Sequence, residues 1–161
     1  MPRRFHDQDV LPDPAPLIRR LLAMLYDGLI CIALLIVATG AYMLVAAQVI
    51  GTVRYRQMAE TGALSGDPLL SSVLFITLFL FFGYFWTRTG QTLGMQVWRI
   101  RIETPDGLSI RWSQALLRFM MGWVSWLCAG LGYLWMLWDG GRQTWTDKFS
   151  ESIVVSVPKK P

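Results

Sequence analysis

Residues 28–53 read GLICIALLIVATGAYMLVAAQVIGTV and are the longest apolar segment of the chain. This run of 26 residues contains no charged side chain, and a membrane-spanning helix needs only about 20 apolar residues. It follows a polar, Pro-rich lead over residues 1–20. A cleavable signal peptide instead has an apolar stretch of only about 7–15 residues directly after a basic start. The run therefore predicts a permanent first membrane-spanning helix over about residues 28–48.

Two further stretches of the sequence also lack charged residues, between Asp67 and Arg88 and between Arg118 and Asp139. The whole chain of 161 residues is 53% hydrophobic and 16% charged, whereas soluble domains carry about 25% charged residues. This composition excludes a disordered regulator, a disulfide scaffold and an ordinary soluble enzyme. Both cysteines, Cys31 and Cys128, lie inside uncharged runs, where they act as small hydrophobic residues. We expect a mainly α, polytopic integral membrane protein with a second span over residues 69–87.

The third uncharged run, residues 119–138, is long enough to cross a membrane, but its middle contains Ala129-Gly130-Leu131-Gly132. A break there would turn the run into a re-entrant helical hairpin, which is tolerated where protein or water covers the irregular backbone. We expect two full spans plus this re-entrant element; three full spans are the alternative.

A small β element is predicted outside the membrane. Residues 97–103 alternate in the manner of a strand, 104–107 form a turn signal, and 108–110 could return as a partner strand. The β-branched run 152–157 also favours a sheet. If this tail strand pairs with the 97–110 hairpin, both segments lie on the same side of the membrane.

The orientation follows from the basic residues of the connections. Arginines are frequent in residues 1–20 and 88–118, whereas the two in residues 51–68 are offset by Glu60 and Asp67. The positive-inside rule therefore places the N-terminus and residues 88–118 in the cytoplasm, with residues 51–68 outside. The basic residues of 139–161 favour a cytoplasmic C-terminus as well.

Charged residues at the start of the first helix need partners. Arg20 and Asp27 share a helical face but are separated by about 10 Å along the axis, and Arg20 leans away from Asp27. We therefore expect Asp27 to meet a donor on another element, with Arg118 as the candidate. Asp139 and Asp147 are the candidate partners of Arg20. Asp27 has two interpretations: an ion pair that stabilises the fold at the interface, or a carboxylate that handles ions or protons.

Small residues recur at helical spacing in the third run. Gly122, Ser125, Ala129 and Gly132 would form one stripe on a continuous helix, which lets another helix approach closely. The stripe is interpreted as an internal packing seam, and an oligomer interface is the alternative.

Several motifs together carry a family resemblance. They are Arg20-Leu-Leu-Ala23-Met-Leu-Tyr-Asp27, Gly90-Gln-Thr92-Leu-Gly94, Asp106-Gly107, Ala115-Leu-Leu-Arg118 and Arg142-Gln143-Thr144-Trp-Thr-Asp147-Lys148. With them the chain resembles the RDD family of membrane proteins, named for one arginine and two aspartates. The resemblance defines a domain over residues 15–157, between a polar lead at 1–14 and a basic tail at 158–161.

The chain departs from the family pattern at three positions. Met95 stands where a lysine is frequent, Thr146 replaces a usual histidine, and Glu151 occupies the place of a small residue or glycine. The resemblance implies a multi-pass protein of the bacterial cytoplasmic (inner) membrane with a cytoplasmic N-terminus. It also suggests transport of unidentified ligands, including ion or proton exchange, although Thr146 argues against a histidine-assisted proton relay.

Motifs of enzymes and of metal or nucleotide sites are missing from the sequence. His6 is the only histidine and has no cluster of potential metal ligands nearby, and the net charge of +4 follows the topology rule rather than forming a patch for nucleic acid. We therefore expect no catalytic residue, metal or cofactor, and no nucleic-acid partner.

Two function classes remain open. The first is transport or exchange of ions, protons or small ligands, with Arg20, Asp27, Arg118, Asp139 and Asp147 at a polar vestibule. The alternative is a non-enzymatic accessory or assembly subunit of a larger membrane complex. The expected partners are the lipid bilayer and either further copies of the chain or such a complex.

Overall fold

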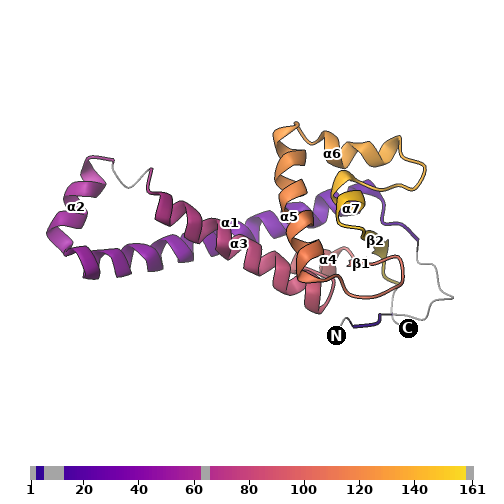
Figure 1. Ribbon diagram of the computed structural model, residues 1–161, viewed down its shortest axis with the longest axis horizontal. Helices are drawn as coiled ribbons and strands as arrows, with labels where there is room; N and C mark the ends of the chain where they lie inside the picture. The colour runs from indigo at the N-terminus through magenta and orange to yellow at the C-terminus, as the bar shows by residue number, and fades with distance from the viewer. Residues whose placement is uncertain (1–2, 6–12, 63–65, 159–161) are drawn as a thin grey trace. The chain divides into compact units, whose positions relative to one another are not determined.

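The computed structural model describes residues 3–5, 13–62 and 66–158, apart from the side chains of residues 58 and 59. It confirms a mainly α protein with a small sheet (Figure 1). In chain order the elements are α1 (Leu17–Ile50), α2 (Thr52–Glu60), α3 (Pro68–Arg88), α4 (Leu93–Val97), β1 (Ile100–Glu103), α5 (Trp112–Leu127), α6 (Leu131–Leu134), the 3-10 helix η1 (Trp135–Leu137), α7 (Trp145–Phe149) and β2 (Ile153–Ser156).

Within the described residues, α1 and α3 are the two single helices long and apolar enough to cross a membrane. They confirm the predicted spans, although α1 begins at Leu17 rather than near residue 28. The additional turns before residue 28 bury one helical face against other parts of the protein. This face carries the buried residues of α1, which are Arg20, Ala23 and Asp27.

The chain forms two compact units. One is the hairpin of residues 29–80, where the Tyr42 hydroxyl donates a hydrogen bond to the Asp67 carboxylate. That carboxylate also accepts a hydrogen bond of 2.9 Å from the backbone amide of Leu69 in the first turn of α3. The other unit combines residues 1–28 with residues 81–161 and contains the sheet and the polar cluster described below.

The sheet of the second unit has two antiparallel strands, and Ile100 lies opposite Ser156 while Glu103 lies opposite Ile153. This pairing confirms that the tail strand joins the 97–110 segment. The lead also joins the sheet, because the Ala15 amide donates a 2.9 Å hydrogen bond to the Val154 carbonyl.

The predicted hairpin over residues 97–110 is wrong. Residues 93–97 are helical, and Arg99 has a left-handed φ of 51°, so the strand cannot begin before Ile100. After the turn at residues 104–107, Leu108 forms a bridge with Arg4 instead of a strand beside β1. The helical start and the turn leave only four residues, Ile100–Glu103, for the strand.

The third uncharged run is broken where the sequence indicated. Ala129 and Gly130 adopt left-handed φ values of 53° and 80°, and the helices on either side meet at an angle of 108°. The prediction of one stripe on a continuous helix is therefore wrong, because α5 ends at Leu127.

The small residues act across this bend instead. A Cβ atom on Gly132 would collide with the Ser125 hydroxyl, so α6 folds back closely onto α5. A Cβ on Gly122 would lie 3.4 Å from the Tyr133 hydroxyl. Gly122, Ser125 and Gly132 thus form an internal seam between α5 and α6.

Glu151 adopts a backbone conformation that favours glycine. Its φ is +49°, in the left-handed region that costs an L-residue about 1–2 kcal/mol. Glu151→Gly removes this penalty, and allowing for the greater chain entropy of glycine we expect a gain of about 1 kcal/mol, measured by thermal unfolding in detergent. Glu151→Ala is the matched control and should give no such gain; equal gains from both variants would show that the carboxylate, not the backbone, is responsible.

Candidate functional site

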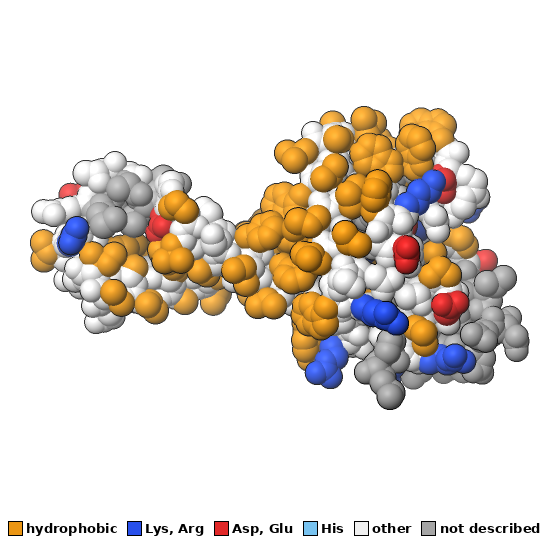
Figure 2. All heavy atoms as spheres, viewed as in Figure 1, with side chains coloured by type: hydrophobic (Ala, Val, Ile, Leu, Met, Phe, Trp, Pro, Cys, Tyr) orange, Lys and Arg blue, Asp and Glu red, His pale blue; other side chains and the backbone are white. Residues whose placement is uncertain are grey.

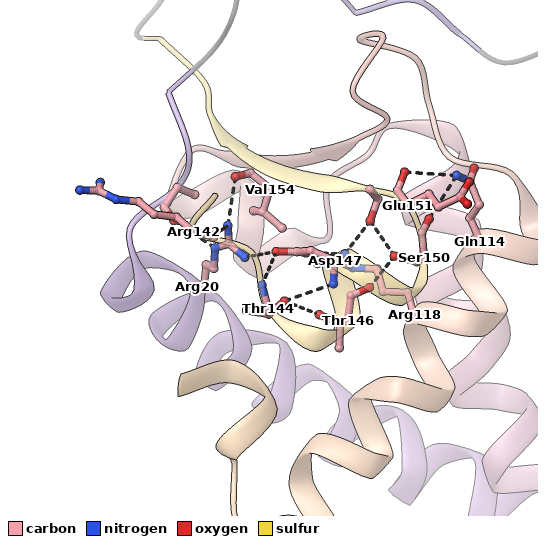
Figure 3. A network of polar contacts seen from close by, with 12 residues as sticks. Arg20, Gln114, Arg118, Arg142, Thr144, Thr146, Asp147, Ser150, Glu151 and Val154 are labelled. Carbon is pink, nitrogen blue, oxygen red and sulfur yellow. Dashed lines mark hydrogen bonds and ion pairs between the residues drawn. The ribbon is translucent and has the colours of Figure 1, made fainter. Parts of the chain in front are cut away.

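The centre of the second unit is the carboxylate of Asp147, which is completely buried on α7. Its two oxygens bind different arginines (Figure 3): Oδ2 lies 2.5 Å from a guanidinium nitrogen of Arg20, and Oδ1 lies 2.7 Å from one of Arg118. The carboxylate therefore connects the first turns of α1 with the middle of α5.

The backbone around Asp147 fixes its direction. Thr144 caps α7, and its hydroxyl accepts a 3.3 Å hydrogen bond from the Asp147 amide. In return, the Thr144 amide donates a 3.1 Å hydrogen bond to Asp147 Oδ2. This reciprocal capping box holds the side chain at the start of a helix only five residues long.

Each arginine has further acceptors. Arg20 donates 3.0 Å and 3.3 Å hydrogen bonds to the carbonyls of Ala15 and Val154. Arg118 donates to the Ser152 hydroxyl at 2.8 Å, and its guanidinium lies 5.8 Å from the centre of the Trp86 ring. The Arg20–Asp147–Arg118 cluster thus connects α1, α3, α5, α7 and β2.

The protonation of Asp147 is set by opposing effects. Complete burial raises the pKa of the carboxyl, but the charges of Arg118 and Arg20 and the hydrogen bonds from Arg20 and Thr144 more than offset this. The pKa of Asp147 therefore lies below its ordinary value, and the cluster holds two positive charges and one negative charge.

Asp27 is also buried but has a different environment. The Thr92 hydroxyl donates to its Oδ2 at 2.5 Å, and the Gly94 amide donates to its Oδ1 at 2.9 Å. Among the described residues, no arginine or lysine forms an ion pair with it. The expected pairing with Arg118 is wrong, because Asp147 occupies that guanidinium.

The Gly90–Gly94 segment has a role that the sequence reasoning missed. Gly90, with a φ of +68°, makes the expected turn after α3. A Cβ atom on Gly94, however, would clash with the Ala23 carbonyl oxygen and would lie 2.9 Å from Asp27 Oδ1. Gly94 is therefore a close-approach residue, and with Thr92 it forms the binding loop of Asp27.

A cavity of about 40 Å³ lies between Asp27 and the cluster. It is large enough for one or two water molecules and has both polar and apolar walls. Its lining includes Arg20, Asp27, Met95, Arg118, Tyr133, Thr144 and Thr146.

Asp139 is not part of this cluster. Its carboxylate binds the Lys148 ammonium at 2.5 Å and accepts a 3.0 Å hydrogen bond from the Gln143 amide. Of the two candidate partners of Arg20, the structure thus selects Asp147. The fourth small residue, Ala129, lies in the exposed bend after α5.

No group of three or more His, Cys, Asp or Glu side chains that could hold a metal ion occurs in the described part of the chain. His6 lies outside those residues.

Comparison with known proteins gives one match. The model of the RDD family matches residues 14–151, which contain every residue of the Arg20–Asp147–Arg118 cluster and the binding loop of Asp27. No curated protein and no solved structure matches the chain.

Neutralising Asp147 tests the structural role of the cluster. Asp147→Asn leaves two buried guanidinium groups without their anion, and removing one partner of a buried ion pair costs about 3–5 kcal/mol. We expect a strongly reduced folded yield in detergent and a lower unfolding midpoint. Asp139→Asn is the matched control and should have little effect, because the Lys148 side chain of its pair is 42% exposed. Similar losses in both variants would contradict the central role of Asp147.

The stability should also fall in acid. Because the pKa of Asp147 is lower in the folded than in the unfolded protein, the unfolded state binds more protons at low pH. The stabilisation is complete above about pH 5 and is lost as the pH falls through about 4, the unfolded-state pKa, and below. Unfolding midpoints measured from pH 7 to pH 3 should show this decline. The decline should persist in Asp139→Asn; its disappearance there would assign it to Asp139.

Proposed function

The chain belongs to the RDD family, and from this premise we propose that it exchanges protons or small cations across the membrane through the Asp27 carboxylate. One observation carries the proposal. Asp27 is a buried carboxylate in a helix apolar enough to span a membrane, and its hydrogen-bond donors among the described residues are both neutral. Ionisable residues in such helices are costly and commonly belong to ion or proton pathways.

The comparison of the two buried aspartates supports separate roles. Protonating Asp147 would leave Arg20 and Arg118 without a counter-charge, so its negative charge is part of the fold. In the described part of the chain, protonating Asp27 leaves no buried cation without its partner. The Gly94 amide can still donate to it, and the Thr92 hydroxyl can rotate to accept a proton. Asp27 can therefore take up and release a proton while Thr92 and Gly94 both stay within hydrogen-bonding reach.

The cavity supports the same assignment. It reaches Asp27 on one side and the Arg20–Asp147–Arg118 cluster on the other. Water in this space would solvate the carboxylate when it is ionised and would supply or remove the proton.

The proposal includes a location and an orientation. We place the protein in the bacterial cytoplasmic membrane with its N-terminus in the cytoplasm. Exposed arginines of the second unit support this side by the positive-inside rule: Arg19, Arg88, Arg99, Arg111 and Arg142. Because two spans alone enclose no pore, further copies of the chain or a larger membrane complex would complete the pathway. The proposed role is not enzymatic.

The test uses purified protein in sealed liposomes. We expect the wild type to dissipate an imposed proton or sodium gradient and Asp27→Asn to abolish this flux, as read from an enclosed pH- or sodium-sensitive dye. The amide cannot release a proton or neutralise a cation, but it keeps both hydrogen bonds, since its oxygen accepts from Gly94 and its nitrogen donates to Thr92. The variant should therefore elute as folded protein.

Asp139→Asn is the matched control and should retain the flux. Wild-type liposomes that are no leakier than empty ones would favour the accessory-subunit alternative. A flux unchanged by Asp27→Asn would overturn the role of Asp27, even if transport itself were real.

A further inference from the structure

The segment α5–α6–η1 carries an apolar surface that the proposed function does not use. We propose that this segment lies along the membrane–water interface, with its exposed face in the lipid of the leaflet where α3 ends at Arg88. Three independent observations carry this placement. It does not depend on the proposed exchange function.

The first observation concerns the two ends of the segment. β1 precedes α5 and β2 follows α7, and these strands pair along four residues each. A single crossing between them would put the strands on opposite sides of the membrane. The segment therefore enters and leaves on the same side.

The second observation is the direction of α5 relative to the last turns of α3. The Trp112 ring packs on Gly83, with its Cζ3 atom 2.5 Å from where a Cβ would be, and the Phe119 ring lies 6.2 Å from that of Phe82. Trp112 and Phe119 are about 10 Å apart along α5, yet their contacts on α3 are adjacent residues. α5 therefore crosses α3 steeply instead of running beside it.

This crossing occurs at the end of a span. Arg118 also contacts α3 in the same turns, through Trp86, and α3 ends at Arg88. A helix that crosses the last turns of a spanning helix at a steep angle lies in the plane of the membrane, near its surface. A re-entrant hairpin would instead run along α3 toward its other end.

The third observation is the distribution of side chains on the segment. One face of α5 is buried against the rest of the second unit. Its buried residues are Ala115, Arg118, Phe119 and Ser125. Large apolar side chains are exposed on the rest, and Figure 2 shows hydrophobic side chains gathered over α5 and α6. They include Leu116, Leu117, Trp123, Val124, Trp126, Leu127, Leu131, Trp135, Leu137 and Trp138.

The chemistry of this face fits lipid at the interface. Tryptophan is enriched where the hydrocarbon meets the headgroups, and four of the exposed side chains named above are tryptophans. Exposed cations border the face: Arg111 precedes α5, and Lys148, which also pairs with the Asp139 carboxylate, has its ammonium 5.9 Å from the centre of the Trp135 ring. Such cations suit anionic headgroups, and α3 keeps the segment next to the bilayer.

Depth measurements with spin labels test the placement. Single cysteines at Leu117, Val124 and Leu127 would be labelled in full-length protein whose Cys31 and Cys128 are replaced by alanine. The protein would be reconstituted into phosphatidylcholine–phosphatidylglycerol vesicles. Relaxation by lipid-soluble oxygen and by a water-soluble nickel chelate then reports the depth of each label. All three sites are exposed in the structure, so the labels should not disturb the fold.

We expect the three labels on α5 to lie at one shallow depth, about 5–10 Å below the headgroup boundary, although they extend over about 15 Å of helix. Matched labels at Ile76, Leu80 and Tyr84 on α3, which are also exposed, should differ in depth by up to about 12 Å.

Three results would overturn the proposal. A depth that increases by about 1.5 Å per residue from Leu117 to Leu127 would show a spanning or re-entrant segment. Labels accessible only to the nickel chelate would show a water-exposed face. Labels shielded from both reagents would show that a second copy or another protein covers the face.

Discussion

The packing of the second unit depends on one buried carboxylate that binds two arginines. Asp147 lies between Arg20 and Arg118, and the three residues come from the start of α1, the middle of α5 and the short helix α7. In a protein with few polar residues, such a cluster gives a specific registry that apolar packing alone does not. Because every member is buried and hydrogen-bonded, the elements cannot shift against one another without exposing an unpaired charge.

The other aspartate of the family motif, Asp27, is bound in a different way. Asp27 is held by the Thr92 hydroxyl and the Gly94 amide, and Gly94 must lack a side chain because the Ala23 carbonyl is in contact with it. The two aspartates are therefore not equivalent. Asp147 has a fixed charge balanced by cations, whereas the neutral donors around Asp27 are compatible with either protonation state. This difference is the physical basis for the proposal that Asp27 takes part in exchange while Asp147 stabilises the fold.

The broken third run contributes both to the buried cluster and to the exposed apolar surface. α5 supplies Arg118 from its buried face and presents leucines and tryptophans on the exposed one. The bend after Leu127 and the close contact between Ser125 and Gly132 turn α6 back onto α5. One short stretch thus combines a polar contact inside the protein with a wide apolar surface outside it.

Features that depend on local composition could be predicted from the amino-acid sequence. Uncharged runs predicted both spans, Ala129-Gly130-Leu131-Gly132 predicted the break, the β-branched tail predicted β2, and the motifs predicted the family. The tertiary structure alone decided which charges meet. Arg118 reaches Asp147 rather than Asp27, and the small residues pack across a bend rather than along one helix. Periodicity places residues on a face of their own element, but a partner depends on how distant elements pack, and helical spacing contains no information about that packing.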